Sequence, residues 1–226
     1  MACGMFDVDS SVIIKETLDE AVERALIGQP DREQMVAEIK RITDLGMEGK
    51  LPFKDSVRQR IKVVPIHRDL LKEIGRDMVG QITPGMPEVF KWLEQHGHTT
   101  YLITGGFEEC VLPIARALDV PMERCIANRF VFDDRGYVSG VDETSLPWTN
   151  EGKGPALRAI RAQRGGEDEV FIMIGDGMND YKAYECGAAN MFIGFGANKR
   201  RAAVVAKAPH FVDSSKQLLE LFKKFL

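Results

Sequence analysis

The 226-residue sequence predicts an α/β fold in which helices flank a mostly parallel sheet. Short apolar runs alternate with segments of helical periodicity, as expected when crossover helices join parallel strands. The clearest predicted strands are Tyr101–Thr104, Val170–Gly175, Met191–Phe195 and His210–Val212. Small or polar residues end or directly follow each of them, and ligands of open α/β sheets bind where the strands end. The sequence therefore places a functional site at that edge of the sheet.

The first strand, Met5–Val8, is the weakest prediction, because only six residues precede Asp7 and Gly4 is among them. A β-hairpin is predicted over Phe130–Val138, with its turn at Asp134–Gly136. A helix of the core is predicted to begin at Thr83-Pro84 and to end at Gly97.

The chain between the first two strands predicts helices and no strand. Further helices are expected after the candidate N-cap Asp31 and from near Phe53 and Arg68. The first apolar stripe with helical spacing consists of Leu18, Ala21, Val22, Ala25 and Leu26. An insertion of this length is typical of a lid over a site. The sequence predicts a core of residues 1–14 and 79–226 and a helical cap domain of residues 15–78.

Composition excludes several classes of protein. Apolar residues make up 44 % and charged residues 28 %, which is ordinary for a globular domain, and the net charge of -4 argues against a nucleic-acid binder. Lys199-Arg200-Arg201 is interpreted as a solvated helix start rather than a nucleic-acid patch. The cysteines lack CxxC spacing, and no segment resembles a signal peptide or a membrane span. We therefore expect a cytoplasmic protein with reduced thiols and no membrane partner.

Two pairs of acidic residues follow predicted strands. Asp7 and Asp9 lie two residues apart on an extended chain, so both side chains can face one site. Asp176 and Asp180 lie in the glycine-containing loop after Val170–Gly175. Either motif alone is as easily a polar turn or a capped helix start. Two of them at strand ends favour a hard cation such as Mg²⁺, which prefers oxygen ligands.

Two further motifs fit an anion beside that cation. Thr104 is followed by Gly105 and Gly106, whose backbone N–H groups, with the next helix N-terminus, can cradle a phosphate. Lys153 lies at a predicted helix start, where a cation opposes the macrodipole and a bound phosphate would explain it. The plain structural alternatives are a tight strand-to-helix turn for the glycines and a solvated side chain for the lysine.

In chain order these motifs read Asp-x-Asp, Thr-Gly-Gly, Lys and Gly-Asp-Gly-x-Asn-Asp. This series resembles the four motifs of the haloacid dehalogenase (HAD) superfamily, and the resemblance extends over the whole chain. It implies a HAD-like Rossmannoid parallel sheet flanked by helices, a small helical cap inserted after strand one, and Mg²⁺-dependent phosphomonoester hydrolysis.

The resemblance also implies roles for the motif residues. Asp7 would be the nucleophile, Asp9 the general acid and base, and Lys153 a stabiliser of the transferred phosphate. The metal would be held by Asp7, the backbone carbonyl of Asp9 and Asp176, with Asp180 supporting it through bound water. The remaining implied phosphate contacts are Thr104, Gly105, Gly106 and Asn179.

The helical insertion resembles the cap of the phosphoserine phosphatases in the segments Val12–Glu20 and Met47–Arg60. There the resemblance implies that Glu16 holds the ammonium of phosphoserine, that Arg60 holds its carboxylate, and that Met47 and Phe53 surround it. An arginine fork suits a carboxylate. Without the resemblance, a helix-start glutamate and a solvated arginine would be the simpler interpretation. The implied reaction, hydrolysis of O-phospho-L-serine, is the last step of serine biosynthesis.

Several alternatives stay open at this level. The motifs do not separate water from an alcohol as the phosphate acceptor, so a phosphotransferase remains possible, as does a phosphatase for another small phosphomonoester. A phospho-accepting switch that resembles receiver domains would be shorter and would lack the helical cap. The sequence does not choose between monomer and homodimer, or between the enantiomers of the substrate.

Overall fold

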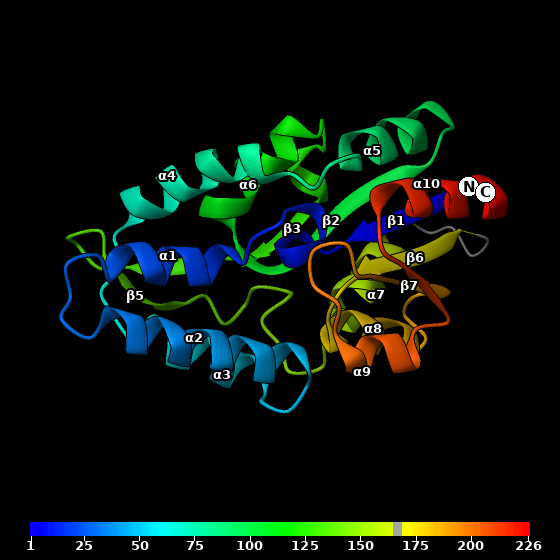
Figure 1. The fold of residues 1–226 in the computed structure, drawn as a ribbon. Helices are drawn as coiled ribbons and strands as arrows, with labels where there is room; N and C mark the ends of the chain where they lie inside the picture. The colour runs from blue at the N-terminus through cyan, green and yellow to red at the C-terminus, as the bar shows by residue number, and fades with distance from the viewer. Residues whose placement is uncertain (165–168) are drawn as a thin grey trace.

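A six-stranded parallel sheet forms the centre of the computed structural model, which describes residues 1–164 and 169–226 (Figure 1). Its strand order is β3-β2-β1-β6-β7-β8, and all adjacent strands run parallel. The strands are β1 (Ala2–Phe6), β2 (Thr99–Phe107), β3 (Cys125–Asn128), β6 (Val170–Gly175), β7 (Met191–Phe195) and β8 (His210–Val212). The predicted α/β class is confirmed, and β6, β7 and β8 have the predicted bounds.

The first strand is stronger than its sequence suggests. It spans Ala2–Phe6 rather than Met5–Val8, is buried along its whole length, and pairs with β2 on one side and β6 on the other. Gly4 supports the strand instead of weakening it, because a Cβ there would lie 2.7 Å from the ring of Phe6. That ring packs against Phe90 at a centroid distance of 4.5 Å.

Two layers of helices cover the sheet. Alternating side chains of β1 divide between the layers: Phe6 packs into the larger apolar cluster, and Met5 into the smaller one on the opposite face. The first layer contains α5 (Met86–Gln95), α6 (Glu108–Ala117) and α10 (Ser215–Phe225), and the second contains α7 (Gly154–Arg164), α8 (Met178–Glu185) and α9 (Ala202–Lys207). Burial of both sheet faces explains why the strands are continuously apolar.

Two element boundaries differ from the sequence prediction. Helix α5 begins at Met86 and not at Thr83-Pro84, because Gly85 adopts a left-handed conformation with φ of 80° just before it. The hydroxyl of Thr83 instead donates to the backbone oxygen of Ser11 at 2.8 Å. Strand β3 was not predicted, since its four residues give too short an apolar signal.

The predicted helical insertion forms α1 (Thr17–Ala25), α2 (Arg32–Met47), α3 (Phe53–Ile61) and α4 (Arg68–Met78). Helices α1, α2 and α3 lie beyond the carboxyl ends of the strands, and α4 packs along α6 (Figure 1). Asp31 precedes α2 but its side chain makes no capping hydrogen bond. The assignment of residues 15–78 to a separate cap domain stays a prediction.

The predicted hairpin is present as β4 (Phe130–Phe132) and β5 (Val138–Val141), a separate antiparallel pair. It contacts the insertion through a backbone hydrogen bond from Val138 to Ile66 of 2.9 Å. Among residues 1–164 and 169–226, no helix combines the length and the hydropathy that crossing a membrane requires.

The close approach at Gly4 predicts a specific cost of adding one methyl group. Gly4→Ala should lower the free energy of unfolding by about 1–3 kcal/mol, because Phe6 is fully buried and has no room to move. Urea unfolding would measure this. Gly80→Ala is the matched control, since among the described residues no atom beyond its own local backbone lies within 4 Å of its Cβ position, and it should be neutral or slightly stabilising. Equal effects of the two substitutions would contradict the packing argument.

Candidate active site

A wide turn at the end of β1 positions the first pair of acids. The N–H of Asp7 donates to the carbonyl of Ile174 at 2.9 Å, so Asp7 still belongs to the sheet edge. The chain then turns over Val8–Val12, with Ser10 in the left-handed region at φ of 55°. As a result the carboxylates of Asp7 and Asp9 line one pocket but have different partners.

Three buried carboxylates gather at the carboxyl ends of β1 and β6. Oxygens of Asp7, Asp176 and Asp180 all lie within 4.8 Å of one another. The N–H of Gly177 donates to Asp180 at 2.9 Å, and the hydroxyl of Ser11 donates to Asp176 at 3.3 Å. The two predicted acidic motifs therefore converge on one place, and Asp180 is part of the cluster.

Lys153 supplies positive charge to this cluster. Its Nζ lies 2.5 Å from Asp7 and 2.6 Å from Asp180, and its backbone N–H donates to the carbonyl of Asn179 at 3.1 Å. Burial lowers the pKa of Lys153, but Asp180 and Asp7 outweigh this and hold the pKa above its ordinary value. Burial, together with Asp180, raises the pKa of Asp7 well above its ordinary range, and Lys153 opposes that rise. The cluster needs cations to remain ionised.

Asp9 faces the start of α1 instead. Its carboxylate accepts the backbone N–H of Thr17 at 2.8 Å and the Thr17 hydroxyl at 3.3 Å. Burial raises the pKa of Asp9 to about 6, although the hydrogen bonds from Thr17 and the charge of Arg60 favour the ionised form. A carboxyl group with a pKa in this range is able to exchange protons near neutral pH.

The Thr-Gly-Gly motif differs from the predicted turn. Strand β2 continues through both glycines to Phe107, with an irregular register against β3. The N–H of Gly106 donates to the hydroxyl of Thr104 at 2.8 Å, so the hydroxyl already has one partner within the motif. Gly105 is needed for space, because a Cβ there would lie 2.8 Å from the ring of Phe53. The glycines thus let α3 approach the sheet.

Arg60 of α3 is buried, which overturns the simpler interpretation of a solvated arginine. Its Nη1 donates to Asp19 at 2.9 Å and to Thr43 at 3.0 Å, and its Nε donates to the backbone oxygen of Ser56 at 3.3 Å. Asp19 and Thr43 had no distinctive signal in the sequence, since their roles depend on the contact of α1 with α2 and α3.

All but one of the predicted site residues line a single pocket between the sheet edge and α1–α3. They are Asp7, Asp9, Glu16, Met47, Phe53, Arg60, Thr104, Gly105, Gly106, Lys153, Asn179 and Asp180. The exception is Asp176, which belongs to the carboxylate cluster with Asp7 and Asp180. Leu18, Pro147 and Thr149 also line the pocket and were not predicted.

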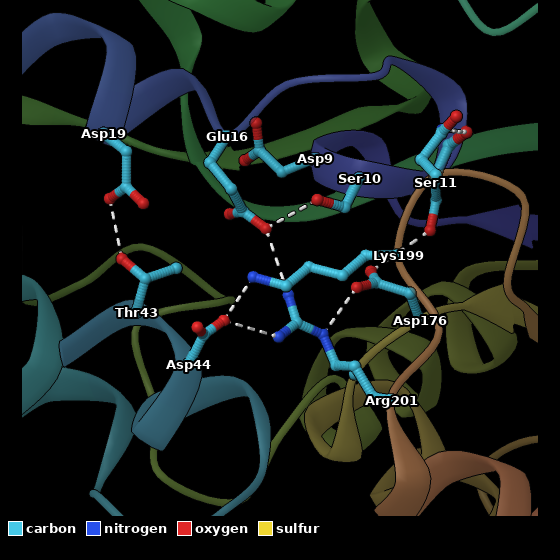
Figure 2. Close-up of polar contacts among 12 residues, drawn as sticks. Asp9, Ser10, Ser11, Glu16, Asp19, Thr43, Asp44, Asp176, Lys199 and Arg201 are labelled. Atoms are coloured by element: carbon cyan, nitrogen blue, oxygen red, sulfur yellow. Dashed lines mark hydrogen bonds and ion pairs between the residues drawn. The ribbon is translucent and has the colours of Figure 1, made fainter. Parts of the chain in front are cut away.

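The sequence prediction was wrong about Arg201, which is only 5 % exposed rather than solvated. Its Nε donates to Asp176 at 2.7 Å, and its Nη2 lies 3.2 Å from Glu16 (Figure 2). Glu16 also accepts the hydroxyl of Ser10 at 2.7 Å. Burial and the charges of Asp9 and Asp19 raise the pKa of Glu16 to about 7, while Arg201 and Ser10 lower it. A run of basic residues gave no sign that one of them turns inward.

Comparison with known proteins agrees with this geometry. The family model described as haloacid dehalogenase-like hydrolase matches residues 5–185. The chain therefore belongs to the haloacid dehalogenase-like hydrolases and, within them, to the phosphoserine phosphatase family, and it is a phosphatase. A phosphoserine phosphatase from Mus musculus is 33 % identical over 214 residues, which cover 95 % of this chain and 90 % of the mouse protein.

Solved structures that superimpose on this chain are described as a phosphoserine phosphatase or a protein like it. A phosphoserine phosphohydrolase-like protein from Francisella tularensis superimposes with a TM-score of 0.88 at 28 % identity and covers 98 % of this chain and 99 % of its own. A structure described as a phospho-aspartyl intermediate analogue of phosphoserine phosphatase has a TM-score of 0.80 at 26 % identity and covers 97 % and 98 %.

The buried ion pairs of Lys153 predict that replacing this lysine lowers the stability of the fold by an amount that depends on pH. Without divalent metal, Lys153→Met should lower the free energy of unfolding at pH 7 by about 3–5 kcal/mol, since Asp7 and Asp180 lose their shared partner. The raised pKa of Asp7 means that the folded state takes up its proton first, so the loss should be smaller at pH 5 than at pH 7.

Urea unfolding at both pH values measures the effect. Lys91→Met, at an exposed lysine of α5, is the matched control and should change little at either pH. A loss in Lys153→Met that stays constant with pH would contradict the assignment of the ion pairs.

Proposed function

We propose that this phosphatase hydrolyses O-phospho-L-serine to L-serine and phosphate through an aspartyl-phosphate on Asp7, with Mg²⁺ as its cofactor. One observation carries the proposal: a single pocket is lined by the Asp7–Lys153 pair at the sheet edge and by Glu16 and Arg60 from the helical insertion. Lys153 suits the phosphate of phosphoserine, Glu16 suits its ammonium, and Arg60 suits its carboxylate. In the cell the reaction would be the last step of serine biosynthesis.

The carboxylate cluster fits a hard divalent cation. Asp7, Asp176 and Asp180 offer oxygen ligands only, are buried, and repel one another at this separation. We propose that Asp7, Asp176 and the backbone carbonyl of Asp9 hold Mg²⁺, and that Asp180 supports it through bound water. The bound cation would neutralise charge on the phosphate, so that an anionic nucleophile can approach it.

In the first step, a carboxylate oxygen of Asp7 attacks phosphorus, and the bond from phosphorus to the serine oxygen breaks. Asp9 donates its proton to that oxygen, which leaves as the hydroxyl of serine. Lys153 stabilises charge on the transferred group. This role is supported by its geometry: the buried Nζ lies beside Asp7 and Asp180, and two carboxylate partners leave one of its three N–H donors for phosphate.

In the second step, the ionised Asp9 takes a proton from water, which attacks phosphorus and releases phosphate and free Asp7. The pKa of about 6 that burial gives Asp9 suits both directions of proton transfer. The proposal of an aspartyl-phosphate is supported by the phospho-aspartyl description of the structural relative.

Substrate recognition would fall to the helices of the proposed cap, residues 15–78. The contacts of Glu16 with Ser10 and Arg201 use its Oε1, so Oε2 is our proposed acceptor for the substrate ammonium. The contacts of Arg60 use Nε and Nη1, so Nη2 is our proposed donor to the substrate carboxylate. Met47, Phe53, Thr104, Gly105, Gly106 and Asn179 complete the proposed binding surface.

Phosphate release from L-phosphoserine, D-phosphoserine and a panel of other small phosphomonoesters tests the proposal. We expect preference for L-phosphoserine, loss of activity in chelator, recovery with Mg²⁺, and a rate at least about a thousandfold lower in Asp7→Asn, which lacks the nucleophile. Release from other esters but not from phosphoserine would refute the assigned substrate. Phosphate transferred to an alcohol instead of water would make the protein a transferase.

The role of Arg60 gives a separate prediction. Arg60→Lys keeps a charge beside Asp19 but loses the fork, so KM for phosphoserine should rise roughly tenfold or more with a smaller change in kcat. Arg58→Lys is the matched control on the same helix, because its side chain is 44 % exposed and pairs with Glu143 at the surface. Similar KM values for the two variants would remove Arg60 from the substrate site.

A further inference from the structure

Asp44 of α2 joins the helical insertion to the catalytic side of the sheet. It accepts from Lys199 and, at 3.2 Å, from Nη1 of Arg201, both of which lie in the loop between β7 and α9 (Figure 2). The side chain of Arg201 is 3 % exposed, whereas those of Asp44 and Lys199 are 44 % and 40 % exposed. Arg201 is therefore the buried member of this contact, beside the site, whereas Asp44 and Lys199 are partly exposed to water.

The position of Asp44 within its helix is unfavourable unless cations lie beside it. It is in the last turn of α2, which contains no basic residue, and a negative charge there opposes the helix macrodipole. Lys199 and Arg201 bring two positive charges to this helix end from another part of the fold. The helix macrodipole disfavours a carboxylate at this position, and the two cations of the loop compensate for it.

Arg201 divides its guanidinium among three carboxylates. Nε donates to Asp176, Nη2 to Glu16 and Nη1 to Asp44. Because the guanidinium is planar and rigid, a contact that holds Nη1 restricts the directions available to the other two donors. Asp44 is thus one of three carboxylates that together set the orientation of Arg201 between Glu16, on the substrate side, and Asp176, in the carboxylate cluster.

Asp44 also lies between two residues of the pocket wall. Thr43 and Met47 of the same helix line the pocket, and Thr43 donates to Asp19, the partner of Arg60. A displacement of this end of α2 would therefore move the wall that is proposed to face the amino-acid part of the substrate.

We propose that Asp44 is a positioning residue: by holding Lys199 and Arg201, it fastens the end of α2 over the pocket and aims Arg201 at Glu16. This inference rests on the proposed function, because it takes Glu16 as the ligand of the substrate ammonium. Asp44 itself touches neither the proposed substrate nor the reacting groups.

The test compares Asp44→Asn with Glu38→Gln, a matched change on the same helix at an exposed pair with Arg41. Asp44→Asn should raise KM for phosphoserine roughly three- to tenfold, as expected for loss of a partly exposed charge that pairs with Lys199 and Arg201, with kcat changed by less than about twofold. Asp44→Glu should recover most of the wild-type KM. Lys199→Met should have a KM between those of wild type and Asp44→Asn, since the contact of Asp44 with Arg201 remains. Glu38→Gln should match wild type.

Hydrogen–deuterium exchange on the protein without substrate provides a second readout. Amides in the last two turns of α2 should exchange at least about threefold faster in Asp44→Asn than in Glu38→Gln, because local opening becomes easier. Unchanged exchange together with unchanged KM would overturn the proposal, and so would a lower Tm with unchanged KM, which would mean a purely structural contact. If wild-type protein failed to hydrolyse phosphoserine, the proposed function would fall, and the exchange comparison would still decide whether Asp44 fastens α2.

Discussion

The ion pairs of Lys153 with Asp7 and Asp180 allow a parallel sheet to end in a cluster of buried acids. Parallel strands bring their carboxyl ends to one edge, so polar residues that follow β1 and β6 must meet there. Three carboxylates within 4.8 Å of one another would repel strongly without a cation. The ionised state of the carboxylate cluster depends on this compensation, which Lys153 supplies from the start of α7.

The same rule of charge compensation extends from the sheet to the helices above it. Arg60 lies against Asp19, and Arg201 lies against Asp176 and Glu16, each in a buried or nearly buried place. Buried ion pairs contribute little net stability, since desolvation offsets most of their attraction. Their value here is geometric: they hold α1, α2 and α3 at a defined distance from the strand ends and leave other atoms of Glu16 and Arg60 available.

Much of the fold was predictable because the signals are local. Strands β6, β7 and β8 are apolar runs bounded by polar residues, and α3 and α4 begin where predicted. Less local features were missed. The end of β2 depends on pairing with β3 beyond the glycines, and the start of α5 depends on the left-handed conformation of Gly85. The strength of β1 comes from its two neighbours rather than from its own five residues.

By itself, the sequence predicted the α/β class and the motif residues, because apolar runs and short motifs are local signals, and the resemblance of the motif series in chain order implied the phosphatase family. Only the tertiary structure decided which charges pair. Arg201 and Glu16 are 185 positions apart in the chain, and Arg201 and Asp44 are 157 apart. No local pattern distinguishes a basic residue that turns into the fold from one that faces water. That choice is made by packing, which excludes water around Arg201 and leaves carboxylates as its partners.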